Sequence, residues 1–150
     1  MAERAPVTLG WREWVGLPAL KVAAIKAKVD TGARTSTLHA LDVTPVVESG
    51  KRRLRFKVLP LQERRDHAVN CVADLVEQRL VSSSTGQREL RWVIRTPLRI
   101  GGGEWPIEVT LTDRDSMQFR MLLGRTALAG HYVVDPTRSF LLGPPAGARR

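Results

Sequence analysis

The stretch that decides the interpretation of this sequence is Lys28-Val29-Asp30-Thr31-Gly32-Ala33-Arg34-Thr35-Ser36. The apolar residues before it predict a strand that ends at Asp30, and Gly32 predicts a tight turn directly afterwards. A carboxylate in that position is held by a rigid strand, and backbone N–H groups can approach it because glycine has no side chain. An ordinary strand-ending turn has the same composition, so a catalytic interpretation needs a second element.

The second element is Met121-Leu122-Leu123-Gly124-Arg125. Its apolar residues predict a short strand. The composition of Arg125–Ala129 predicts one or two helical turns that stop at Gly130.

Together the two elements resemble the signatures of retropepsin-type aspartic peptidases: Asp-Thr-Gly-Ala after a strand, and two apolar residues before Gly-Arg. With the opening segment Gly10–Pro18, the sequence is similar to a bacterial retropepsin-like family that is associated with the glutamate ligase RimK and often labelled "ATP-dependent zinc protease". The resemblance covers roughly residues 8–136. The label does not suit the sequence, which contains neither a His-Glu-x-x-His helix nor a Gly-x-x-x-x-Gly-Lys loop.

The fold that this resemblance implies is an all-β, retropepsin-like closed barrel with one short C-terminal helix. We expect residues 1–142 to form this domain and residues 143–150 to be a disordered basic tail. Residues 66–80 fit a helix about as well as strands. Elsewhere, apolar alternation between turn signals predicts strands at Thr8–Val15, Leu20–Asp30, Leu38–Val47, Leu54–Leu59, Leu90–Ile94, Trp105–Thr112 and Met121–Leu123.

The resemblance also implies the chemistry. Asp30 would be catalytic, with Thr31, Gly32, Ala33, Leu123 and Gly124 as supporting residues. The sequence has a single Asp-Thr-Gly, and Asp113 after another apolar run lacks the following glycine. The second carboxylate would therefore come from Asp30 of a symmetric partner, which implies a homodimer. The two carboxylates would share a proton and activate one water.

Two features depart from viral retropepsins, and the position of the flap leaves two alternatives open. Arg34 stands where many retropepsins have the Asp that pairs with the arginine of the Gly-Arg element, so we expect Arg34 and Arg125 to bind a substrate carboxylate. The motif Gly143-Pro144-Pro145 cannot form an interleaved terminal strand, so a dimer needs another interface, or the protein is a monomer without an active dyad. The turn Ser84-Thr85-Gly86 is predicted to be either a flap tip or an ordinary surface hairpin.

Composition narrows the classes of function. The 150 residues carry 24 Lys and Arg against 15 Asp and Glu, a net charge of +9 that favours acidic partners. The sequence does not favour nucleic acid as the partner, because the few aromatic residues do not interleave with an exposed basic stripe. No apolar run approaches the ~20 residues that span a membrane. A single cysteine, Cys71, fits the cytoplasm.

We predict no metal site and no cofactor, because the potential soft ligands form no recognisable motif: His39, His67, Cys71 and His131. The sequence thus predicts a cytoplasmic aspartic endopeptidase that favours Glu- or Asp-rich peptides. The alternative is a binding module with the same fold that recognises acidic peptides or ribonucleoprotein surfaces without cleaving them.

Overall fold

The computed structural model describes residues 6–60, 68–82, 85–114 and 118–145, and almost all of its regular structure is β-strand. The elements in chain order are β1 (Val7–Leu9), β2 (Arg12–Leu17), a short 3-10 turn (Pro18–Leu20), β3 (Val22–Asp30), β4 (Ser36–His39), β5 (Leu41–Glu48), β6 (Lys51–Val58), β7 (Val69–Ser82), β8 (Arg88–Ile100), β9 (Gly103–Thr112), β10 (Met121–Gly124), α1 (Arg125–Leu128) and β11 (Tyr132–Val134). In the described part of the chain, no helix is long and apolar enough to cross a membrane.

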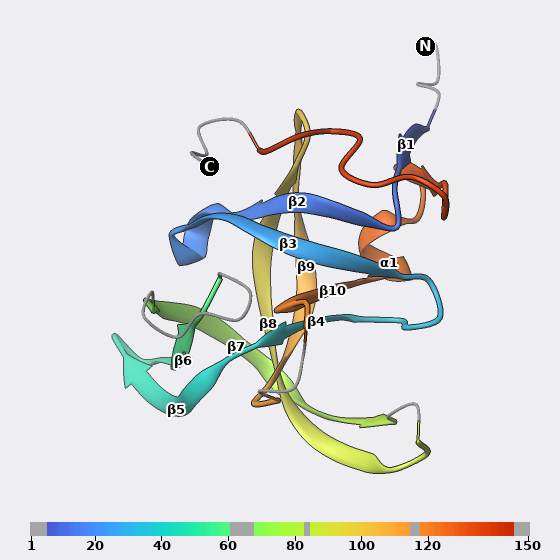
Figure 1. Cartoon of the computed structure of the whole chain (residues 1–150). Helices are drawn as coiled ribbons and strands as arrows, with labels where there is room; N and C mark the ends of the chain where they lie inside the picture. The colour runs from blue at the N-terminus through green and yellow to red at the C-terminus, as the bar shows by residue number, and fades with distance from the viewer. Residues whose placement is uncertain (1–5, 61–67, 83–84, 115–117, 146–150) are drawn as a thin grey trace.

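Six of the strands form a ring in the order β2-β3-β10-β4-β9-β8 (Figure 1). The ring is closed where Gly16 of β2 lies opposite Arg99 of β8, the one residue pair that joins these two strands. Apolar residues at alternate positions of the ring strands point inward and form the core, among them Val15, Ile25, Leu38, Ile94, Val109 and Met121. The predicted all-β fold with one short helix after β10 is therefore confirmed.

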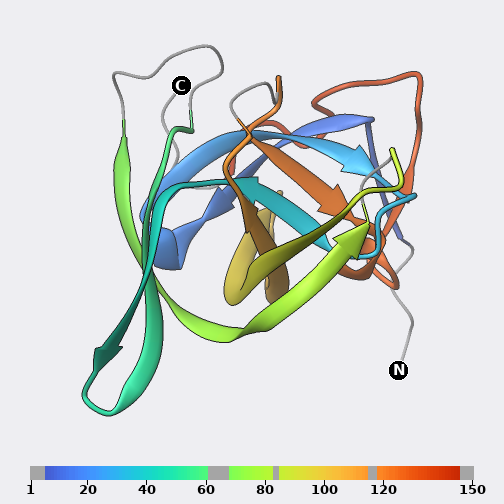
Figure 2. The ribbon, with the colours of Figure 1, turned by 90° about the horizontal axis from the view of Figure 1, so that it is seen from below.

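The sheet continues outward from β8 through β7, β6 and β5, and Figure 2 shows the β5–β6 hairpin projecting from the ring. The ambiguous residues 66–80 form a strand as far as the structure describes them, because the first half of β7 pairs with β6 and the second half with β8. Cys71 and Ala73 are buried at alternate positions there, which is the strand period.

Two predicted strands are each divided in the structure. Residues 8–15 contain β1 and β2, which are separated at Gly10, where a β-carbon would lie 2.3 Å from the carbonyl oxygen of Arg138. This close approach of the C-terminal segment bends the chain. Residues 38–47 are divided at Ala40, so that β4 belongs to the ring and β5 to the outer sheet.

The two ends of the described chain are joined by a buried carboxylate. Glu13, which is 0% exposed, accepts hydrogen bonds from the backbone N–H groups of Gly10 (2.7 Å), Leu141 (2.9 Å) and Leu142 (3.2 Å). The chain continues in contact with the fold beyond the expected boundary at residue 143, since Pro145 is buried and would contact a β-carbon at Gly16. Residues 146–150 lie outside the described residues.

Candidate active site

Asp30 is the last residue of β3, and the parallel register of β3 and β10 places it opposite Gly124. Its carboxylate is only partly buried, and its Oδ1 accepts a hydrogen bond from the backbone N–H of Gly32 at 3.1 Å. A β-carbon at Gly32 would lie 3.3 Å from that oxygen. The turn thus holds the carboxylate through a backbone donor and leaves it accessible, as the sequence predicted for this position.

The turn after Asp30 is fixed against the beginning of α1. The N–H of Arg125 donates to the carbonyl oxygen of Ala33 (2.8 Å), and Thr126 donates through both its N–H and its hydroxyl to the carbonyl of Arg34. Gly124 lies so close to this turn that a β-carbon would be 2.6 Å from the carbonyl carbon of Thr35. Its own N–H donates to the hydroxyl of Ser36 at 3.0 Å. The two sequence elements, about 90 residues apart, therefore form one unit.

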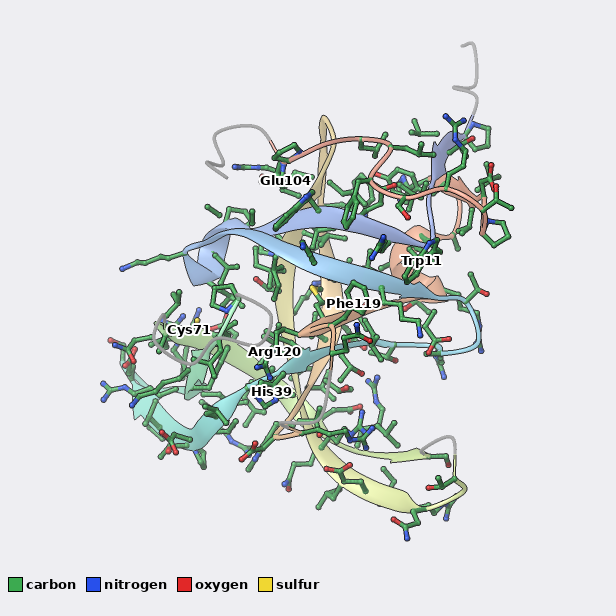
Figure 3. All side chains as sticks on the ribbon, viewed as in Figure 1. Trp11, His39, Cys71, Glu104, Phe119 and Arg120 are labelled. Carbon is green, nitrogen blue, oxygen red and sulfur yellow. The ribbon has the colours of Figure 1, made fainter. Side chains whose placement is uncertain are left out.

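A cleft of about 540 Å³ opens beside Asp30. The turn after β3 borders it on one side and the second half of β7 on another, and strands β4, β8 and β9 contribute its polar residues. Phe119 lines the cleft and packs edge-on against Trp11, with ring centroids 5.8 Å apart (Figure 3). The described residues that line the cleft include one acid, Asp30, and five cations: Lys28, Arg34, Arg79, Arg91 and Arg114.

Carboxylates neutralise these cations unevenly. Arg79 contacts Glu77 (2.6 Å) and Glu108 (3.1 Å), while Arg91 and Arg114 share Glu89. Lys28 and Arg34 are exposed, and no described carboxylate lies within ion-pair distance of either one. The cleft therefore attracts anions around a single acid.

The predicted supporting residues lie together, and the two predicted substrate-binding arginines lie on adjoining segments but differ in their relation to the cleft. Arg34 lines the cleft, whereas Arg125 is not among the lining residues and donates through Nη1 to the carbonyl oxygen of Gly32 at 3.2 Å. The usual acidic partner of this arginine is replaced by a backbone carbonyl. Thr31 is exposed beside Asp30, and Leu123 is buried in β10 opposite Val29.

The predicted flap coincides with the β7–β8 hairpin. Ser84 lies outside the described residues, and Thr85 and Gly86 belong to the turn of this hairpin, where Gly86 has a φ of +84°. The end of β7, residues 79–82, lines the cleft, so the hairpin borders the Asp30 site. Sequence reasoning did not find Arg79, Arg91 or Arg114, because no local signal distinguishes a cleft-facing arginine from a solvated one on a strand.

The potential metal ligands are dispersed. His67 lies outside the described residues, His39 accepts a hydrogen bond at Nδ1 from the N–H of Arg114, and Cys71 is buried. Within the described ranges, no three His, Cys, Asp or Glu residues are grouped so that they could hold an ion. Burial raises the pKa of the Cys71 thiol to about 11, so it is protonated at neutral pH and unsuited to act as a nucleophile.

Residues 8–145 match the family model of RimB-like proteins, described as the retropepsin-like aspartic endopeptidase RimB. The chain belongs to this family. The family model describes an aspartic endopeptidase, so the family and enzyme class predicted from the two motifs are confirmed. A crystal structure of a Legionella pneumophila protein of unknown function (DUF785) has the same fold, with a TM-score of 0.76 and 26% identity, covering 92% of this chain and 99% of that one.

Curated relatives are longer proteins. The chain is 45% identical over 135 residues to a probable alpha-L-glutamate ligase of Shewanella pealeana, and 46% identical over 137 residues to one of Parasynechococcus marenigrum. These matches cover 90% and 91% of this RimB-like chain but only 30% and 29% of the ligases. A RimB-like domain is therefore present in proteins that carry a ligase name.

Proposed function

We propose that this RimB-like protein is an aspartic endopeptidase that cleaves acidic peptides as a homodimer, with Asp30 of each subunit as the catalytic residue. The observation that carries the proposal is the partly buried Asp30 carboxylate, held opposite Gly124 beside a cleft. One subunit supplies a single acid to that cleft, as far as the structure describes its lining. Asp113, which directly follows the end of β9, is exposed and does not line the cleft.

In the proposed mechanism, a two-fold axis passes between the two Asp30 carboxylates and a water lies between them. Two carboxylates this close cannot both ionise easily, so they share one proton. The ionised Asp30 takes a proton from the water while the protonated one donates to the carbonyl oxygen of the substrate amide. The resulting tetrahedral intermediate collapses with proton transfer to the leaving amine. Thr31 would brace the dyad and Gly32 would contact the substrate backbone.

The preference for acidic substrates is supported by the cations around the cleft. Lys28 and Arg34 are exposed at its edge without a described carboxylate partner. They can attract a Glu- or Asp-rich chain and contact its side chains. The relation to proteins named glutamate ligases makes glutamate-extended tails the first substrates to examine. The single buried cysteine suits a reducing compartment, so we expect the enzyme to act in the cytoplasm.

The test combines activity with mass in solution. The wild-type protein and Asp30→Asn are incubated with acidic and neutral peptide libraries across a range of pH, and cleavage is followed by mass spectrometry. Cleavage by the wild type alone supports the proposal, and equal cleavage by both variants contradicts it. Sedimentation with and without acidic peptide reports the oligomer, and a strict monomer that still cleaves would exclude the two-Asp30 mechanism. Binding of acidic peptides without cleavage favours the binding module instead.

A further inference from the structure

Arg91 of β8 is a buried cation in the cleft that the motifs did not indicate. Its side chain is only 6% exposed, yet it is among the residues that line the cleft. Its Nε and Nη2 donate to the same carboxylate oxygen of Glu89, at 3.3 and 3.2 Å, and its Nη1 reaches the hydroxyl of Thr37 at 3.5 Å. A guanidinium buried to this degree needs strong partners, and Glu89 is the one carboxylate that the described structure provides.

Glu89 holds two arginines at once. It is 46% exposed, and the oxygen that binds Arg91 lies 3.7 Å from Nη2 of Arg114, while its other oxygen lies 3.5 Å from the hydroxyl of Thr112. Two positive charges at the cleft are thus compensated by one negative charge. The group remains one positive charge in excess, and a carboxylate from outside would balance it.

The surroundings of Arg91 are a built polar site. The hydroxyls of Thr37 (β4) and Thr110 (β9) are 3.0 Å apart, both residues are buried, and both line the cleft beside the guanidinium. Of the five N–H donors of a guanidinium, Glu89 takes two and Thr37 one. One donor on each terminal nitrogen remains, which is the number that a bidentate carboxylate needs.

We propose that Arg91 is a specificity-determining residue whose guanidinium, with Thr37 beside it, binds a glutamate or aspartate side chain of the substrate. Glu89 is the positioning residue: it accepts hydrogen bonds from Nε and Nη2 of Arg91 and so orients the guanidinium. Its negative charge also competes with the substrate carboxylate for this cation. This inference rests on the proposed function, since it assigns the site in the same cleft that recognises the acidic substrate. The selective contact is thereby assigned to the buried Arg91, and the exposed Arg34 has an accessory role.

The test measures binding in the Asp30→Asn protein, so that its outcome does not depend on cleavage. Three fluorescent peptides are compared: an alternating Ala–Glu peptide with blocked ends, its Ala–Gln counterpart with blocked ends, and the Ala–Gln peptide with a free C-terminal carboxylate. We expect Arg91→Gln to weaken binding of the glutamate peptide about ten-fold and to leave the blocked glutamine peptide unchanged. Equal binding of the glutamate peptide before and after the substitution overturns the proposal.

A second variant covers the case in which Arg91→Gln fails to fold. Glu89 is half-exposed, so Glu89→Gln should fold, and removing its charge should strengthen binding of the glutamate peptide about three- to ten-fold. The matched control is Glu104→Gln, because Glu104 is also 46% exposed and bound to an arginine of β8, Arg99. Glu104 itself belongs to β9 and lies away from the cleft at the tip of the β8–β9 hairpin (Figure 3). An unchanged affinity in Glu89→Gln, or an equal gain in Glu104→Gln, overturns the inference.

The three peptides also show whether the carboxylate that binds Arg91 belongs to a side chain or to the C-terminal end of the peptide. If the Arg91-dependent gain appears only with the free C-terminal carboxylate, the site binds a chain end and the side-chain assignment is wrong. Failure of the proposed function has a different signature. In that case the wild-type protein cleaves none of the peptides, while the dependence of glutamate-peptide binding on Arg91 persists.

Discussion

Asp30 and Gly124 lie opposite each other in the parallel register of β3 and β10, so the carboxylate and the turn that carries α1 meet at the same end of the ring. The glycine leaves the space through which the chain after Asp30 passes, since backbone atoms of Thr35 lie 2.6 and 2.8 Å from the position that a β-carbon would take. The position of the carboxylate thus depends on a residue that has no side chain.

Gly124→Ala should destabilise the protein by about 1–3 kcal/mol, because its β-carbon would lie 2.6–2.9 Å from backbone atoms of Thr35 and Arg34, which cannot move as a flexible side chain can. Urea unfolding measures the change. Gly102→Ala is the control: no atom lies within 4 Å of a β-carbon there, and we expect a change within about 0.5 kcal/mol. Equal effects at the two glycines would contradict the close approach.

Glu13→Gln should reduce the free energy of unfolding by about 1.5–3 kcal/mol, because three backbone N–H groups lose a charged acceptor. The NH₂ group of the glutamine would also point at backbone N–H donors, with which it cannot form a hydrogen bond. Hydrogen exchange at the amides of Leu141 and Leu142 should accelerate more than at the ring strands. Glu104→Gln provides the comparison for a half-exposed glutamate. Unchanged exchange at both amides would show that Glu13 does not hold the C-terminal segment.

Stability should fall as the pH rises from 9 towards 11. Burial raises the pKa of Cys71, which is 3% exposed, from 9.0 to about 11, so only the unfolded thiol releases its proton in this interval. The resulting loss is about 1.4 kcal/mol per pH unit. Burial also raises the pKa of Tyr132 to about 12, which extends the decline above pH 10.

The control for this pH dependence is Cys71→Val, which removes the thiol and keeps an apolar side chain in the core. Denaturant unfolding at pH 8, 9, 10 and 11 should give a shallower decline for the variant than for the wild type between pH 9 and 11. Parallel curves for the two proteins would mean that the thiol does not contribute.

Arg34→Ala should lower the ratio of kcat/KM for acidic over neutral peptides about three- to ten-fold, because an exposed guanidinium at the cleft edge contributes less than a buried one. Arg53→Ala is the control. Arg53 is bound to Glu48 and Asp74 on the outer sheet, and its removal should change only the salt dependence of the rate. An unchanged ratio in Arg34→Ala would exclude contact with the substrate.

Arg125→Ala should lower kcat for acidic and neutral peptides by the same factor. Its guanidinium donates to the carbonyl of Gly32 and does not line the cleft, so its loss should loosen the turn that holds Asp30 rather than remove a substrate contact. Steady-state kinetics on matched peptides measure both factors. A decrease in kcat for acidic peptides alone would show instead that Arg125 binds the substrate carboxylate.

The sequence by itself determined the elements and the pair of motifs. Strand periodicity, glycine turns and the residues around Asp30 and Gly124 are local signals, and they were sufficient for an all-β, retropepsin-like fold whose family the comparisons confirm. The sequence did not show that β7 is one strand. Its first half pairs with β6 and its second half with β8, so its apolar pattern reflects two different neighbouring strands.

Only the tertiary structure decided which cations share the cleft. Thr37, Arg91 and Thr110 come from three strands and meet because the register of β4 with β9 and of β9 with β8 brings them side by side. Side-chain neighbours across a sheet depend on register, and a shift of one residue would turn each of them to the opposite face. The pairing of β3 with β10 likewise brings Arg125 to the backbone carbonyl of Gly32, while Arg34 of the same turn lines the cleft.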